Sequence, residues 1–291
     1  MVMRYFDDMI RAKANADGAL FTLEASVNGA VVYLDNWAVG DLAEGAPSRR
    51  RRFLDAIRSG GMDLLFSVTN VAEFSGPKGR SAEAVKTFLD EIGPRWFPGK
   101  FDVTELIKAE QRGESQGTVF VDETFLKSYV ADLMRPEKVI CFSDDFFRLG
   151  PLVDRMGSQR ESLSASFSQF DEELKRAVSE ARENLKKLPR IPFDRARPAY
   201  FVYLNLLRIM EAEANSLKKG DGLDFCHTVL ACAYANFAAL DKQWKRRAAS
   251  LPMPNRIARI YSEPDLDQMV ADMESWVTHS KHEPSTQLVI P

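Results

Sequence analysis

Residues 31–35, with the sequence VVYLD, predict a buried β-strand that ends in a carboxylate. Its β-branched and aromatic residues are typical of strands in a sheet core. Similar apolar runs occur at residues 63–68 (DLLFSV), 138–143 (KVICFS), 237–240 (FAAL) and 257–262 (IARIYS). Helical patterns separate these runs. Strands that alternate with helices predict an α/β fold in which helices flank a parallel sheet.

One local signal disagrees with this arrangement. The dipeptide Asn28-Gly29 lies between extended runs and indicates a β-hairpin. A hairpin partner does not suit a strand at the centre of a parallel sheet. Either the hairpin precedes the sheet, or the run at 31–35 is longer than its strand, and the sequence leaves both open.

The middle of the chain has a helical pattern. Apolar residues recur at spacings of three and four from Leu163 to Leu188, which predicts one amphipathic helix over residues 159–187. After a proline-rich break, Pro198 can open another helix. We expect one domain over residues 1–291, with a core at 30–80 and 218–278, a helical insertion at 81–217 and a loose tail at 279–291.

The composition limits the classes of protein. Lys and Arg number 39 against 42 Asp and Glu, so a nucleic-acid-binding surface would have to be a local patch. The three cysteines include no CxxC pair and do not indicate a disulfide framework. The chain lacks both a signal-peptide pattern and an apolar run of roughly 20 residues. We expect a cytoplasmic protein with no membrane partner.

Carboxylates recur where strands end or helices begin. Asp35 ends the first run, Glu73 follows the second, Asp221 and Asp224 begin a helix, and Asp241 ends the run at 237–240. The carboxyl ends of parallel strands form a ligand crevice, so these acids could converge. Packed carboxylates raise each other's pKa, and Mg²⁺ or Mn²⁺ relieves the repulsion because it prefers oxygen ligands.

The segments that carry these acids resemble the PIN-domain nuclease family. They are VVYLDNWAV, SVTNVAEF, DGLDFCHTVLACAYANFAALDKQW and the closing IARIYSEPDLDQMV. The resemblance implies that Asp35, Glu73, Asp224 and Asp241 are the catalytic ligands of Mg²⁺ or Mn²⁺, with Asp221 as an extra ligand. It also implies that a metal-activated water hydrolyses RNA. Three positions depart from the family pattern and concern substrate positioning: Trp37, Asn236 and Leu240.

Each acid also has a structural interpretation. Asp35 and Asp241 could cap the helices that follow them. Asn70 and Glu73 have the spacing of a capping box. Asp221 makes a good N-cap, which would place Asp224 near the third helical position, where a negative charge suits the helix dipole. The order of the four acids along the chain favours the metal site over four separate caps.

Two basic runs, SRRRRF at 48–53 and KQWKRR at 242–247, could each be a solvated helix face. The second follows Asp241, so its side chains could instead bind RNA phosphates, with the indole stacking on a base. The candidate RNA-binding residues are Lys242, Trp244, Lys245, Arg246 and Arg247.

Other polar residues are assigned lesser roles. His227 is expected in the core, where it could orient an acid. Cys226 and Cys232 are expected to pack within a helix. The spare acids, which capping explains as well, are Glu110, Asp144 and Asp145.

We therefore expect a metal-dependent ribonuclease. The first alternative is a non-catalytic PIN-like scaffold whose helices bind a protein. A second is a phosphatase of the haloacid dehalogenase type, which needs an Asp where Trp37 stands. RNA is the expected partner. The sequence leaves open a homodimer and, for a toxin, an inhibitor protein.

Overall fold

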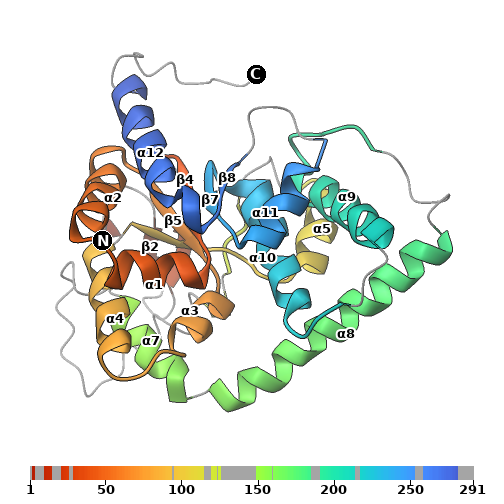
Figure 1. Ribbon diagram of the computed structural model, residues 1–291, viewed down its shortest axis with the longest axis horizontal. Helices are drawn as coiled ribbons and strands as arrows, with labels where there is room; N and C mark the ends of the chain where they lie inside the picture. Colours follow the sequence, from red (N-terminus) through yellow and green to blue (C-terminus); the bar gives the residue numbers. More distant parts are fainter. Residues whose placement is uncertain are drawn as a thin grey trace.

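A five-stranded parallel sheet forms the centre of the computed structural model (Figure 1). The strand order is β6-β5-β4-β7-β8. Four of the five predicted runs are strands in this sheet, and the predicted α/β class is confirmed. The strands are β4 (Val31–Leu34), β5 (Asp63–Phe66), β6 (Trp96–Pro98), β7 (Phe237–Ala239) and β8 (Arg259–Tyr261). The structure describes residues 2–3, 10–14, 21–25, 29–93, 95–114, 119–122, 124–125, 149–158, 160–184, 191–213, 217–252 and 258–280.

Strand β6 corrects the predicted organisation. It pairs in parallel with β5, although it lies inside the segment expected to be a helical insertion. The insertion therefore contributes a strand to the core. The run is only three residues long and ends in Pro98, which an edge strand tolerates because its proline needs no ladder donor. The strand predicted at 138–143 lies outside the described residues.

The hairpin signal does not place β4 in a hairpin. Strand β4 pairs in parallel with β5 on one side and β7 on the other, so both of its edges are used. A separate antiparallel sheet contains β1 (Val2–Met3), β2 (Ile10–Ala14) and β3 (Phe21–Ala25). Strand β3 therefore pairs with β2 and not with β4. Asn28 itself lies outside the described residues.

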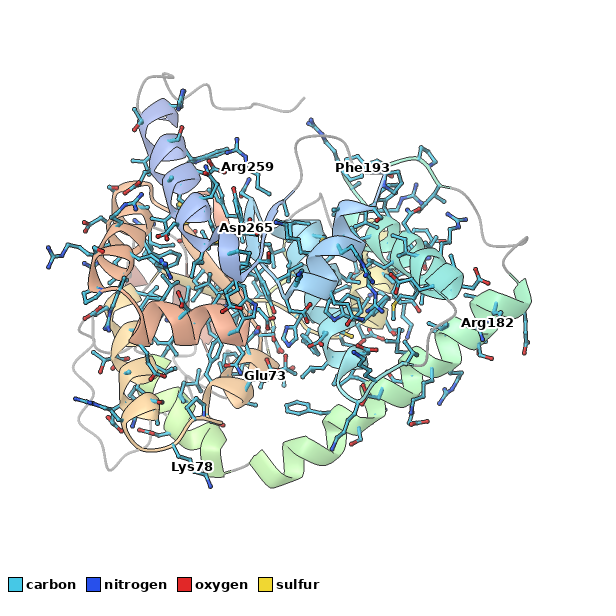
Figure 2. All side chains as sticks on the ribbon, viewed as in Figure 1. Glu73, Lys78, Arg182, Phe193, Arg259 and Asp265 are labelled. Atoms are coloured by element: carbon cyan, nitrogen blue, oxygen red, sulfur yellow. The ribbon has the colours of Figure 1, made fainter. Side chains whose placement is uncertain are left out.

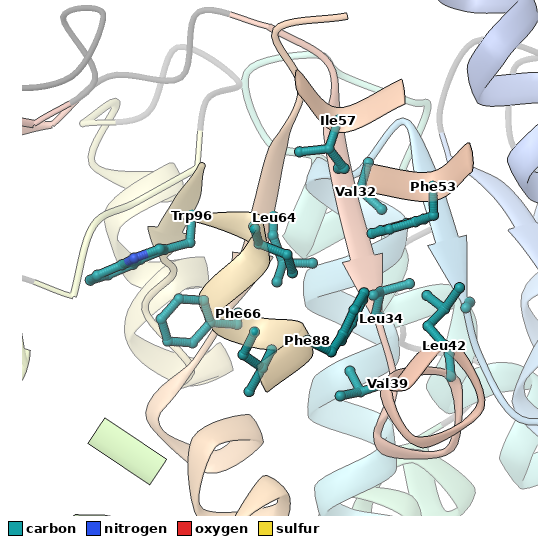
Figure 3. Close-up of a cluster of buried hydrophobic side chains, with 14 of the residues drawn as sticks. Val32, Leu34, Val39, Leu42, Phe53, Ile57, Leu64, Phe66, Phe88 and Trp96 are labelled. Carbon is teal, nitrogen blue, oxygen red and sulfur yellow. The ribbon is translucent and has the colours of Figure 1, made fainter. Parts of the chain in front are cut away.

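Both faces of the sheet are buried because the side chains of each strand alternate between two apolar cores. Val32 and Leu34 contribute to the first core, shown in Figure 3, and Val31 and Tyr33 to the second. The first core includes residues of α1 (Asn36–Glu44), α2 (Pro47–Ser59), α3 (Val68–Phe74), α4 (Arg80–Ile92), α7 (Leu149–Ser158) and α12 (Leu266–Ser280). The second includes residues of α5 (Val103–Gln111), α8 (Arg160–Asn184), α9 (Pro198–Glu213), α10 (Asp221–Tyr234) and α11 (Lys242–Ala249).

The predicted helices of the middle segment are confirmed in α8 and α9. Helix α8 covers most of the predicted 159–187, and Pro198 is the first residue of α9. In Figure 1, α8 is the long green helix that extends along one side of the molecule. None of the helices in the described ranges is both long enough and apolar enough to cross a membrane.

The strand order creates a topological switch point between β4 and β7. The chain builds outward from β4 through β5 to β6, then returns to the other side of β4 with β7 and β8. At the carboxyl ends of β4 and β7, the Asp35 amide donates to the Ala239 carbonyl at 3.1 Å. In open α/β sheets, ligands bind outside the carboxyl ends of the strands at such a point.

Candidate active site

Two of the predicted acids lie at the switch point and cap helices there. Asp35 follows β4 and is the N-cap of α1, with its Oδ1 accepting from the Asn36 amide at 2.8 Å. Asp241 follows β7 closely and caps α11, with its Oδ1 accepting from the Trp244 amide at 2.8 Å. The capping interpretation is thus confirmed for both. Each cap uses one carboxylate oxygen, so the second oxygen remains available for a ligand.

Glu73 lies on α3, and it does not belong to a capping box. The box consists of Ser67 as N-cap and Asn70 as the third helical residue, so the predicted Asn70–Glu73 box is wrong. Glu73 sits one turn further along the helix, and its Oε2 lies 3.4 Å from Nε2 of His227 on α10. Figure 2 shows Glu73 on α3, in the middle of the molecule.

A buried polar network holds His227 in place. The Tyr33 hydroxyl lies 2.5 Å from Nδ1 of His227, and Asn70 Nδ2 donates to the same hydroxyl at 3.1 Å. Because Asn70 supplies a donor to the phenolic oxygen, the phenol can donate to Nδ1 of the neutral ring. The Nε2–H group then lies on the side of Glu73, with Nε2 3.4 Å from Oε2, so the ring faces that carboxylate without a formed hydrogen bond.

The charge on His227 depends on two opposing effects. Burial lowers the pKa of His227. The adjacent Glu73 carboxylate and the more distant acids raise it by a larger amount, so the net shift is upward. The histidine is nearly inaccessible to solvent, with an exposed fraction of 2%. The sequence indicated that His227 could orient an acid, but it gave no signal that Tyr33 and Asn70 would contact the histidine, because these contacts exist only in the folded chain.

Asp224 is held by an indole from the next helix. Trp244 Nε1 donates to Asp224 Oδ2 at 3.2 Å. This bond joins α10 to α11, so it connects Asp224 to the helix that Asp241 caps. The side chain of Asp224 is only partly buried.

The start of α10 differs from the prediction. Its N-cap is Gly220, with a positive φ of 97°, so Asp221 is the first helical residue and not the cap. The Asp221 carboxylate instead accepts from the Lys218 amide at 2.8 Å in the preceding turn. The free amides at the start of α10 are satisfied by an acid from another helix. Asp171 on α8 accepts from the Gly220 and Gly222 amides, the latter at 2.9 Å.

Asp35, Glu73, Asp224 and Asp241 form one electrostatic group, named here the carboxylate cluster. Burial, together with the other acids of the cluster, raises the pKa of Asp35 to about 6 and that of Asp224 to about 7. His227 opposes both shifts. Asp221 is not part of this cluster, because its carboxylate accepts from the Lys218 amide in the preceding turn.

The chemistry of the carboxylate cluster suits a hard divalent cation. Carboxylate oxygens are the preferred ligands of Mg²⁺ and Mn²⁺, and a cation would offset the mutual repulsion. Among the described residues, the buried Oε2 atom of Glu73 accepts no hydrogen bond. Within the described ranges, however, no three His, Cys, Asp or Glu side chains are already placed as a ligand set. The donors fit a metal in kind and charge without forming a closed site.

The basic run on α11 is only partly available to a ligand. Trp244 and Arg247 have exposed fractions of 2% and 4%, so in this fold neither side chain is free to contact RNA directly. The Arg247 guanidinium stacks over the Trp244 ring, 4.4 Å from its centroid, and pairs with Glu213 at 2.9 Å. Lys242 and Arg246 are exposed at the surface.

The basic run on α2 joins helices together. Several of its arginines form ion pairs with acids of neighbouring helices, so the run connects helices and is not simply a solvated face. The pairs include Arg49 with Asp41 and Asp267, Arg50 with Glu91, and Arg52 with Glu274.

Glu110 has a structural role. Its carboxylate is buried and accepts from the Ala199 and Tyr200 amides at 2.9 and 2.8 Å, and from the Tyr234 hydroxyl at 2.8 Å. It therefore caps α9 from a distance. Burial raises its pKa, although these hydrogen bonds oppose the shift. Asp144 and Asp145 lie outside the described residues.

The two described cysteines pack inside α10, as predicted. Both Cys226 and Cys232 are buried. Burial raises the pKa of Cys232 to about 12 and also raises the pKa of Cys226, so both thiols stay protonated near neutral pH. A protonated thiol is a poor nucleophile and a poor metal ligand.

Comparisons of the chain with protein-family models, with curated proteins and with solved structures found no significant match. The argument for a function therefore rests on the geometry and charge of the site.

Proposed function

We propose that this chain is a metal-dependent nuclease that hydrolyses RNA phosphodiester bonds at the carboxylate cluster. The observation that carries the proposal is the concentration of negative charge at the switch point. After burial, the carboxylates of Asp35, Asp241 and Glu73 raise the pKa of Asp224, and His227 lowers it. A site that gathers carboxylates in partial burial is suited to a divalent cation. The resemblance of the surrounding segments to PIN-domain nucleases supports the same activity.

In this proposal the four carboxylates of the cluster would hold Mg²⁺ or Mn²⁺. The bound ion would lower the pKa of a water molecule and offset charge that develops on the phosphate. Backbone amides fix Asp35 and Asp241, because each acid caps a helix. Side chains fix the other two, since Trp244 donates to Asp224 and His227 faces Glu73.

Replacing both capping acids with Asn tests the proposal. Asn is as good an N-cap as Asp, so the Asp35→Asn/Asp241→Asn variant should fold normally. We expect it to lose Mn²⁺ binding in calorimetry and Mn²⁺- or Mg²⁺-dependent cleavage of a fluorescent single-stranded RNA. Asp102→Asn is the matched control, because Asp102 caps α5 by accepting from the Glu105 amide at 3.0 Å.

Unchanged cleavage by the folded double variant would refute the assignment of the site. If the unmodified protein bound no Mn²⁺, the nuclease proposal would fail, and a non-catalytic scaffold would become the better interpretation.

A further inference from the structure

A pocket of about 570 Å³ lies between α11 and the short 3-10 helix η3 (Glu263–Asp265). Helix α11 follows β7 and η3 follows β8, so both walls continue from the carboxyl ends of neighbouring strands. The pocket is therefore at the same edge of the sheet as the carboxylate cluster. Its walls include Lys242, Lys245, Arg246, Ala249, Pro264 and Asp265.

Helical spacing places one face of α11, which contains three basic side chains and an alanine, along this pocket. Lys242, Lys245, Arg246 and Ala249 follow the spacing i, i+3, i+4 and i+7, which is one face of a helix. Trp244, between them in sequence, is buried in the second core. The same run of basic residues thus divides into an inward face and a face that lines the pocket.

The pocket carries excess positive charge. Three of its lining side chains are cationic and one, Asp265, is acidic. Lys245 pairs with Asp265 at 2.6 Å, which leaves Lys242 and Arg246 to provide the excess. Lys242 is exposed and has no ion-pair partner among the described residues. Arg246 is 69% exposed and lies 3.3 Å from Glu213, a carboxylate that Arg247 also binds.

Most of the remaining surface of the pocket is apolar, although Gln243 and Ser262 also line it. Ala249, Pro264 and the aliphatic stems of the basic side chains provide a surface for a sugar or an unpaired base. Asp265 is fixed by Ser262, whose amide and hydroxyl donate to Oδ2 at 3.0 and 2.7 Å. The combination of exposed cations at Lys242 and Arg246 with a largely apolar wall suits a nucleotide better than a small inorganic anion.

We infer that this pocket binds the phosphodiester backbone of single-stranded RNA beside the carboxylate cluster. Lys242 and Arg246 contact phosphates, and the apolar wall receives an unpaired nucleotide. Lys242 directly follows Asp241 in the chain, so a strand held by this lysine passes next to the cluster. The inference deepens the proposed nuclease function and rests on it for the choice of RNA.

Binding measured without divalent metal tests the pocket separately from cleavage. The full chain in EDTA is titrated with a fluorescein-labelled 12-nucleotide oligo(U) RNA, and anisotropy is followed at several salt concentrations. Lys242→Ala/Arg246→Ala should weaken binding roughly 10-fold at 0.1 M salt. It should also reduce the slope of log K against log salt by about 1.4, since each single-strand phosphate contact contributes about 0.7.

Arg51→Ala/Lys78→Ala is the matched control. Both residues are exposed, and the variant removes the same number of positive charges. In Figure 2, Lys78 lies well away from Asp265, which lines the pocket. The control should change the affinity by less than about 2-fold, because removing charges far from the strand affects only weak, screened interactions.

The outcomes separate the pocket from the nuclease. Equal losses in both double variants, unchanged binding by the pocket variant, or no RNA binding by the unmodified protein would each overturn the pocket assignment. Cleavage with a pocket variant that binds normally would leave the nuclease intact and remove only the pocket. RNA binding that needs Lys242 and Arg246, without any cleavage, would support the pocket and refute the nuclease.

Discussion

Replacing Asp224 with Asn should stabilise the metal-free protein, and by more at pH 8 than at pH 5.5. Burial and the neighbouring carboxylates raise the pKa of Asp224 from 3.8 to about 7. An acid whose pKa is higher in the folded state binds its proton more tightly there, so its ionisation opposes folding. This cost is absent below the unfolded pKa, grows as the pH rises, and is complete above the folded pKa.

The size of the effect follows from the shift. One pKa unit corresponds to about 1.4 kcal/mol, so a shift from 3.8 to about 7 sets an upper limit of about 4 kcal/mol at pH 8 and about 2 kcal/mol at pH 5.5. Asp224 is partly exposed, and solvent screening reduces the expected gain to about 1–2 kcal/mol at pH 8. Asn retains an oxygen that can accept from Trp244 Nε1, so this hydrogen bond survives.

Urea unfolding at both pH values, in EDTA, measures the free energy of unfolding. Asp221→Ala is the control, because it removes the acceptor of the Lys218 amide and should cost about 0.5–2 kcal/mol at either pH. Mn²⁺ at 100 times its Kd should stabilise the unmodified protein by about 2.7 kcal/mol and Asp224→Asn by less. If Asp224→Asn destabilised the protein equally at both pH values, its carboxylate would be purely structural.

Two further substitutions test the supports of the site and of the fold. His227→Gln should weaken Mn²⁺ binding by about 10-fold or more in calorimetry, because it removes the group that orients Glu73, and an unchanged affinity would contradict this role. Glu110→Ala should cost about 3 kcal/mol in urea unfolding, since it leaves the Ala199 amide and the Tyr234 hydroxyl without their acceptor. Its RNA cleavage should be unchanged under folding conditions, and a loss of activity with full stability would contradict a structural role.

The sheet was largely predictable because its central strands β5, β4 and β7 are buried on both faces and therefore appear as continuous apolar runs. Strand β6 escaped prediction, since three residues that include a proline carry too little pattern to separate a strand from a loop. The hairpin signal at Asn28-Gly29 was local, whereas the partners of β4 come from residues far along the chain. Parallel pairing between distant strands therefore decides the neighbours of β4, whatever turn the Asn28-Gly29 dipeptide favours.

The positions of Asp35 and Asp241 were predictable for a related reason. An acid that follows a strand of a parallel sheet must lie at the ligand-binding edge, whatever its partners. The start of α10 was not predictable, because Asp171 reaches it from another helix. The burial of Trp244 and Arg247 could have been anticipated from helical spacing, since they lie opposite the face that contains Lys242 and Arg246.

Capping and the proposed metal binding would reinforce each other in this site. Because backbone amides hold Asp35 and Asp241, these two charges cannot move apart to relieve their repulsion. Asp224 is similarly tied to α11 through Trp244. The repulsion therefore persists in the folded chain and adds to burial, the larger cause, in raising the pKa values of Asp35 and Asp224. A proton or a divalent cation relieves it, so the hydrogen bonds that start the helices also maintain the charge that would attract the metal.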